Sequence, residues 1–123
     1  MLLAGAALAQ PACPLSGEVT AELLLGTWQA ELPGDWDAAT LTLVKHPEFT
    51  GSFHGTLQRG SRTWQVAGDY DDGAFTLEES ADGKHIAAAW IGEIAEGSCG
   101  REIRGTWTRD GETAGGPFVL RKR

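Results

Sequence analysis

The sequence predicts an all-β protein, an up-and-down antiparallel barrel of about eight short strands that follow a short N-terminal helical turn. Apolar and polar residues alternate with the strand period of two almost to the C-terminus. Short polar turns separate the alternating segments, and no segment is suited to a long crossover helix. Such a sheet is most stable when it curls closed and loses its edges, although a two-sheet β-sandwich would show the same periodicity.

The length and the net charge of the chain limit its domain organisation and its classes of function. A chain of 123 residues suits one domain, and 41% hydrophobic with 22% charged residues is ordinary for a packed globular fold. The formal net charge of -7 argues against nucleic-acid binding, because phosphate contacts need a basic surface. We divide the chain into a signal peptide (1–9), an N-terminal tail with a short helix (10–25) and a β-barrel domain (26–123).

The first nine residues have the composition of a secretory leader. The run is apolar, and Ala7-Leu8-Ala9 has the small-x-small form that signal peptidase accepts, so we expect cleavage after Ala9. No positive residue precedes the run, a departure that fits a truncated or misassigned start. The run is too short to span a bilayer. We therefore expect a periplasmic or secreted protein without a membrane span.

Two cysteines, Cys13 and Cys99, are present. An even number of cysteines in an exported chain predicts a disulfide, which would join the N-terminal tail to the far end of the chain. No Cys-x-x-Cys spacing points to a metal or redox site. We therefore expect a structural bond.

The elements follow in order. Val19, Leu23 and Leu24 have roughly helical spacing after a possible cap at Ser16, which predicts one helical turn across an end of the sheet. Strand-type alternation then predicts eight strands, at 27–32, 40–43, 52–57, 63–70, 75–77, 86–90, 102–108 and 118–121.

The triplet Gly26-Thr27-Trp28 opens the first predicted strand and recurs at 105–107. A Gly-x-Trp here, after a helical turn, resembles the calycin group of small barrels, which includes lipocalins, fatty-acid-binding proteins and avidins. The resemblance implies that Trp28 closes one barrel end under a cation from the last strand, Arg121 or Lys122. In length and strand count the chain is most similar to avidin-like proteins or bacterial metalloprotease inhibitors. The resemblance covers the fold from Leu23 onward, and no stretch matches an avidin biotin site.

Little in the sequence predicts catalysis, a metal or a cofactor. The three histidines lie near loops without metal-ligand spacing. Glu78 and Glu79 are adjacent, so a strand places them on opposite faces, where only one of them can face inward near a barrel mouth. The acidic segment 69–73 lacks the spacing of a known calcium loop and is better explained as a charged hairpin turn. We therefore expect a protein that is not an enzyme.

The five tryptophans are the most informative feature for function. Trp64, Trp90 and Trp107 are in phase with apolar strand faces, and Trp36 lies in a Gly-Asp-Trp-Asp loop. Inward tryptophans either wall a ligand pocket or fill the core of a narrow barrel. The inferred inward set is almost wholly apolar, which favours core filling over a pocket.

Three functional hypotheses follow. In the first, the protein carries or scavenges a small apolar or aromatic ligand, with Trp64, Trp90 and Trp107 as pocket walls and Trp36 at the mouth. In the second, it is a protein-binding inhibitor of the protease-inhibitor type that uses its N-terminal segment 10–15 or its loops. In the third, it is a structural envelope protein.

A further prediction concerns self-association. If Ile86, Ala88 and Trp90 face inward, then Ala87, Ala89 and Ile91 form an outward apolar stripe. Such a stripe suits pairing with a second copy, and packing under the N-terminal tail is the competing explanation.

Overall fold

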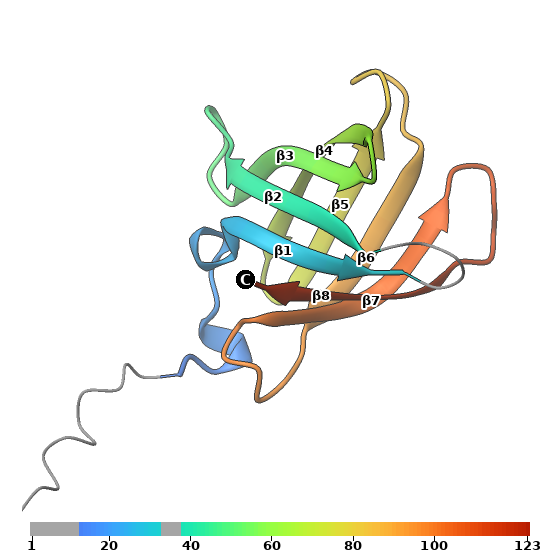
Figure 1. Cartoon of the computed structure of the whole chain (residues 1–123). Helices are drawn as coiled ribbons and strands as arrows, with labels where there is room; N and C mark the ends of the chain where they lie inside the picture. Colours follow the sequence, from blue (N-terminus) through green and yellow to red (C-terminus); the bar gives the residue numbers. More distant parts are fainter. Residues whose placement is uncertain (1–12, 33–37) are drawn as a thin grey trace, which may run out of the picture.

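The computed structural model describes residues 13–32 and 38–123. This part of the chain forms a closed barrel of antiparallel strands in sequence order, β1 to β8 (Figure 1). The up-and-down barrel is therefore confirmed, and the two-sheet sandwich is wrong. The strands are β1 (Gly26–Glu31), β2 (Ala39–Lys45), β3 (Ser52–Arg59), β4 (Arg62–Asp71), β5 (Ala74–Ser80), β6 (Ala88–Ile94), β7 (Glu102–Arg109) and β8 (Gly116–Lys122).

Pairing of the first and last strands closes the barrel. In this ladder Ala30 lies opposite Leu120, and Gln29 lies opposite Arg121. The Gly26-Thr27-Trp28 triplet lies on β1, whereas its repeat at 105–107 lies on β7. Closure leaves none of the eight strands as an open edge.

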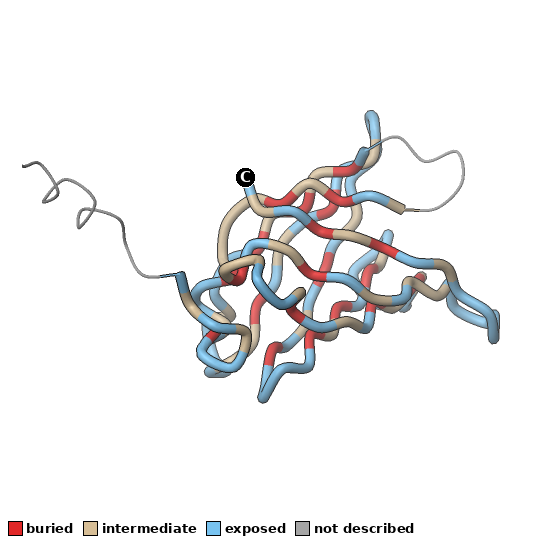
Figure 2. The backbone as a smooth tube through the Cα atoms, turned by 90° about the horizontal axis from the view of Figure 1, so that it is seen from below, coloured by how far each residue is buried: buried red, intermediate tan, exposed pale blue. Residues whose placement is uncertain are grey.

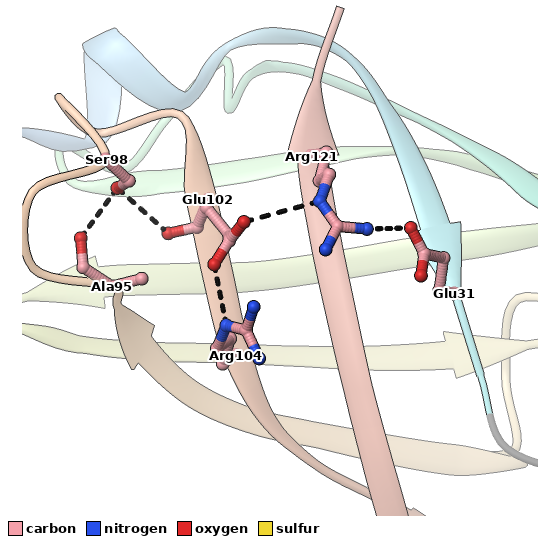
Figure 3. A network of polar contacts seen from close by, with 6 residues as sticks. All are labelled: Glu31, Ala95, Ser98, Glu102, Arg104 and Arg121. Atoms are coloured by element: carbon pink, nitrogen blue, oxygen red, sulfur yellow. Dashed lines mark hydrogen bonds and ion pairs between the residues drawn. The ribbon is translucent and has the colours of Figure 1, made fainter.

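An ion-pair network on the outside of the barrel links β1, β8 and β7 (Figure 3). Arg121 on β8 forms an ion pair with Glu31 on β1, and its Nε lies 3.3 Å from an oxygen of Glu102 on β7. The other carboxylate oxygen of Glu102 accepts a hydrogen bond of 2.6 Å from Arg104 Nε. Arg121 thus bridges the two neighbours of its own strand across the point of closure.

The N-terminal segment forms two short 3-10 turns, η2 (Ser16–Glu18) and η3 (Ala21–Leu24), where one helical turn was predicted. The predicted disulfide is confirmed, since Cys13 is bonded to Cys99 with 4.9 Å between their Cα atoms. The bond joins the segment before η2 to the connection between β6 and β7. Residues 1–9, the predicted signal peptide, lie outside the described residues.

Buried positions alternate with exposed ones along the strands (Figure 2). Aromatic side chains pack against one another in the middle of the barrel. The Phe53 and Phe75 rings stack at a centroid distance of 5.8 Å, and Trp90 meets Phe118 edge to face at 4.9 Å. The largest fully buried side chains are Trp28, Trp90, Phe53, Phe75, Phe118, Leu24, Leu41, Leu43, Leu57, Leu77, Ile103 and Leu120.

One predicted strand begins later than expected. Ile86, expected to face inward, precedes β6 and is 47% exposed. The reason is the structured loop before β6, in which one oxygen of Asp82 accepts hydrogen bonds from the backbone N–H groups of Lys84 and His85. Of the predicted outward stripe, Ile91 is 63% exposed, whereas Ala87 lies before β6. Self-association through this stripe stays a prediction.

Candidate binding site at the barrel mouth

The two ends of the barrel differ. The N-terminal turns and the C-terminus lie at one end, which we call the closed end (Figure 1). The connections β3–β4, β5–β6 and β7–β8 lie at the other end, which we call the mouth.

Trp28 occupies the closed end. Its side chain is fully buried, and its Nε1–H donates a hydrogen bond of 2.8 Å to the carbonyl oxygen of Leu24 in η3. Lys122 Nζ lies 5.7 Å from the Trp28 ring centroid and donates to the carbonyl oxygen of Leu23. Burial, and secondarily the charge of Arg101, lowers the pKa of Lys122. Of the two cations expected over Trp28, Lys122 therefore lies there, while Arg121 makes its ion pairs on the outside.

The mouth contains a pocket of about 340 Å³, which we call the mouth pocket. Side chains from five strands and the loop before β6 surround it. They are Arg59, Arg62, Trp64, Glu79, Ala87, Ala88, Trp107 and Arg109.

A buried carboxylate organises one wall of the mouth pocket. Glu79 on β5 is 1% exposed. Its carboxylate accepts hydrogen bonds from both terminal nitrogens of Arg59, at 2.7 and 2.9 Å. Its Oε1 also accepts the indole N–H groups of Trp90 at 3.0 Å and Trp107 at 2.7 Å. We call these four residues the Glu79 cluster. Because buried charge is costly unless paired, the cluster fixes both indole rings against β5.

Guanidinium groups lie over the two partly exposed indoles of the mouth pocket. The guanidinium carbons of Arg59 and Arg62 are 5.4 and 5.0 Å from the Trp64 ring centroid. Arg109 lies 5.7 Å from the Trp107 centroid. These distances are within cation–π range, so the rings and the cations orient one another.

The charge of the mouth pocket is opposite to that of the chain. Three arginines and one glutamate line it, in a protein of net charge -7. Arg59 is neutralised by Glu79, whereas neither Arg62 nor Arg109 forms an ion pair within residues 13–32 and 38–123. The mouth pocket therefore keeps two positive charges.

Trp64 in the mouth pocket has an indole N–H donor that is not used in the part of the chain that the structure describes. Trp64 Nε1 is buried and has no hydrogen-bond partner among the described residues. A buried N–H without an acceptor costs about 1–3 kcal/mol, so an acceptor that reached it would be favoured.

The structure places the four predicted ligand-binding tryptophans differently. Trp64 and Trp107 line the mouth pocket. Trp90 is fully buried in the core and touches the pocket only through the Glu79 cluster. Trp36 lies outside the described residues. Because aromatic rings fill the middle of the barrel, a ligand would bind at the mouth and not inside the barrel.

The sequence analysis allowed one of Glu78 and Glu79 to face inward near a barrel mouth, and Glu79 does so, but it missed the arginines of the mouth pocket because it expected an almost wholly apolar inward set. These charged side chains continue the inward rows by two residues each. Arg59 follows Leu57 on β3, Glu79 follows Leu77 on β5, and Arg109 follows Trp107 on β7. Extending the period of two to the strand ends would have found them.

The polar groups outside the mouth pocket are weaker candidates for a functional site. The β5–β6 loop holds an exposed pair in which His85 Nδ1 lies 2.7 Å from Asp82 Oδ2. Hydrogen bonds from His85 lower the pKa of Asp82, and in turn Asp82 raises the pKa of His85. Within the described ranges, no group of three or more His, Cys, Asp and Glu side chains could hold a metal ion.

A larger hollow of about 520 Å³ lies at the closed end. Carboxylates from Asp72, Glu93 and Glu96 line it, and its one aromatic residue is Tyr70. Tyr70 is buried, and burial, followed by the charge of Asp72, raises its pKa. This hollow lacks the paired indoles and buried polar cluster of the mouth pocket.

No protein-family model matches the chain, and a comparison with curated proteins finds no significant relative. Among the described residues, no helix has the length and apolar character needed to cross a membrane.

Proposed function

We propose that this protein is an exported, non-catalytic binding protein of calycin-like architecture whose mouth pocket takes a small ligand with a flat apolar body. The observation that carries the proposal is the pair of partly exposed indoles, Trp64 and Trp107, on the lining of a pocket of about 340 Å³. Small-molecule sites typically measure about 300–1,000 Å³ and combine aromatic walls with a few fixed polar groups.

The Glu79 cluster supports a binding role. Its carboxylate accepts hydrogen bonds from Arg59, Trp90 and Trp107, so it holds the wall in place before any ligand arrives. A wall that is already ordered loses little conformational entropy on binding. The cluster thus acts as a support for the binding surface and not as a proton-transfer group.

The Cys13–Cys99 bond supports export, because disulfides persist in oxidising compartments. Together with the leader-like residues 1–9, it favours the periplasm or the outside of the cell. The closed eight-stranded barrel, with Trp28 buried at one end beside Lys122, supports the calycin-like assignment.

Filling the mouth pocket tests this function. Ala87 lines the mouth pocket just before β6 begins, so Ala87→Phe should fill part of the pocket with little effect on the barrel. Calorimetric titration with 2-naphthamide, a neutral aromatic probe, should give saturable binding to the wild type and at least tenfold weaker binding to the variant. Equal binding to both proteins, or no binding to either, would overturn the proposal.

A second candidate, a protein-binding inhibitor, is favoured by one observation. Leu15 is 71% exposed, two residues after the disulfide-bonded Cys13. An exposed apolar side chain on a tethered segment is suited to contact with a protein partner. Leu15→Asp, which keeps the Cys13–Cys99 bond, should abolish such inhibition and leave 2-naphthamide binding intact, which separates this candidate from the first.

A further inference from the structure

We propose that the ligand of the mouth pocket is a small aromatic acid, whose carboxylate is bound by Arg62 and Arg109. This inference rests on the proposed binding function and adds the chemical class of the ligand. It follows from three features of the mouth pocket: the charge left after internal pairing, the unused indole donor and the restricted size.

The three arginines of the mouth pocket differ in their ion pairing. Arg59 has a side chain that is only 12% exposed, and its ion pair with the 1% exposed Glu79 makes it part of the wall. Arg62 and Arg109 are exposed at the rim and have no carboxylate partner in the part of the chain that the structure describes. Glu79 is the one acidic residue of the lining. An anion entering the mouth pocket would therefore meet two uncompensated guanidinium groups.

The positions of these two guanidiniums suit an aromatic anion. Arg62 lies over the Trp64 ring, and Arg109 lies over the Trp107 ring, at centroid distances of 5.0 and 5.7 Å. Stacking on an indole restricts the long arginine side chain before binding. Less conformational entropy is therefore lost when the arginine binds a carboxylate. Guanidinium–carboxylate bonds are also stronger than neutral hydrogen bonds.

The buried Nε1–H of Trp64 gives an independent indication. It belongs to a lining residue of the mouth pocket and has no acceptor among the described residues. The charged groups around it, Arg59 and Arg62, are donors and cannot satisfy it. A carboxylate offers acceptor lone pairs and no donor, which complements a site made of N–H groups.

Size and overall charge favour a small molecule over a polyanion. A volume of about 340 Å³ accommodates one small ligand. The whole chain has 17 Asp and Glu against 10 Lys and Arg, and one glutamate and three arginines of these line the mouth pocket, so the rest of the chain is strongly acidic. A nucleic acid or an acidic peptide that extended beyond the pocket would be repelled by this surface.

The test compares two probes with the same ring system, 2-naphthoate and its neutral amide 2-naphthamide, by calorimetric titration. The wild type should bind 2-naphthoate about tenfold more tightly than 2-naphthamide, a preference that weakens as salt is added. Arg62→Gln and Arg109→Gln should each reduce this preference, and in the double variant the ratio of the two affinities should fall to about one. Both arginines are exposed and make no ion pair among the described residues, so the variants should fold.

Arg104→Gln is the matched control. It removes the same charge from β7 at the closed end, where Arg104 pairs with Glu102, and it should leave both affinities unchanged. In ¹⁵N spectra of the wild type, 2-naphthoate should shift the Trp64 indole signal, assigned with Trp64→Phe.

The outcomes separate the inference from the proposed function. If 2-naphthamide binds and Ala87→Phe blocks it, but 2-naphthoate binds no more tightly, the aromatic-acid inference is wrong and the binding function stands. A preference for 2-naphthoate that survives the Arg62→Gln/Arg109→Gln change also overturns the inference. If neither probe binds, both the inference and the binding function fail.

Discussion

Replacing Glu79 with glutamine should remove much of the stability of the barrel. The glutamate oxygens accept two bonds from Arg59 and one each from Trp90 and Trp107, all between 2.7 and 3.0 Å. Glutamine keeps one acceptor oxygen and turns the other position into a donor that faces donors. Arg59, 12% exposed, would also lose its counter-charge. Removing one partner of a buried ion pair costs about 3–5 kcal/mol, out of a typical total of about 5–15 kcal/mol.

Guanidinium chloride unfolding, followed by tryptophan fluorescence, measures this loss. The matched control is Glu78→Gln, the same change one residue earlier, where the side chain is exposed on the outside of β5. It should change the free energy of unfolding by less than about 0.5 kcal/mol. Two results would refute the supporting role of the Glu79 cluster. One is a free energy of unfolding for Glu79→Gln that lies within about 1 kcal/mol of the wild-type value. The other is an equal loss of this free energy in Glu78→Gln and Glu79→Gln.

Two further predictions concern the disulfide and the β5–β6 loop. Replacing Cys13 and Cys99 together by serine removes a cross-link between residues with a sequence separation of 86. In the chain-entropy model this lowers the free energy of unfolding by about 4 kcal/mol. An unchanged denaturation midpoint would contradict this prediction. The pKa of His85, raised by Asp82, should fall toward 6.5 in Asp82→Asn when its ring signals are titrated by NMR. Because the folded-state pKa is raised, the pair stabilises the fold at low pH and loses this effect as the pH rises through that pKa. An unchanged His85 titration in the variant would contradict the assignment.

The fold was predictable because a closed β-sheet imposes a strict pattern on its sequence. Side chains at positions two apart face the same way, so Phe75 and Leu77 on β5 identify the inward face of their strand. The same period places Glu79 inward, yet a glutamate interrupts an apolar row. The adjacent pair Glu78-Glu79 indicated that one of the two could face inward, and the row of Phe75 and Leu77 identifies it as Glu79.

The placement of other side chains depends on tertiary and loop contacts, which the periodicity of the sequence does not reveal. Trp90 and Trp107 are directly opposite each other on β6 and β7, yet one is core and the other lines the mouth pocket. The difference arises from distant packing, since Phe118 on β8 covers Trp90. The inward placement of Ile86 was wrong because Asp82 orders the preceding loop through its own hydrogen bonds. Such local side-chain-to-backbone bonds override a strand pattern.

The most direct test of the central claim, that binding occurs at the mouth, is a crystal structure of the protein grown with 2-naphthoate. The proposal predicts density for the ring system against Trp64 and Trp107, with the carboxylate within hydrogen-bond distance of Arg62 or Arg109. Density at the closed end, in the hollow lined by Tyr70 and Glu93, would contradict it, as would an empty mouth pocket at saturating probe.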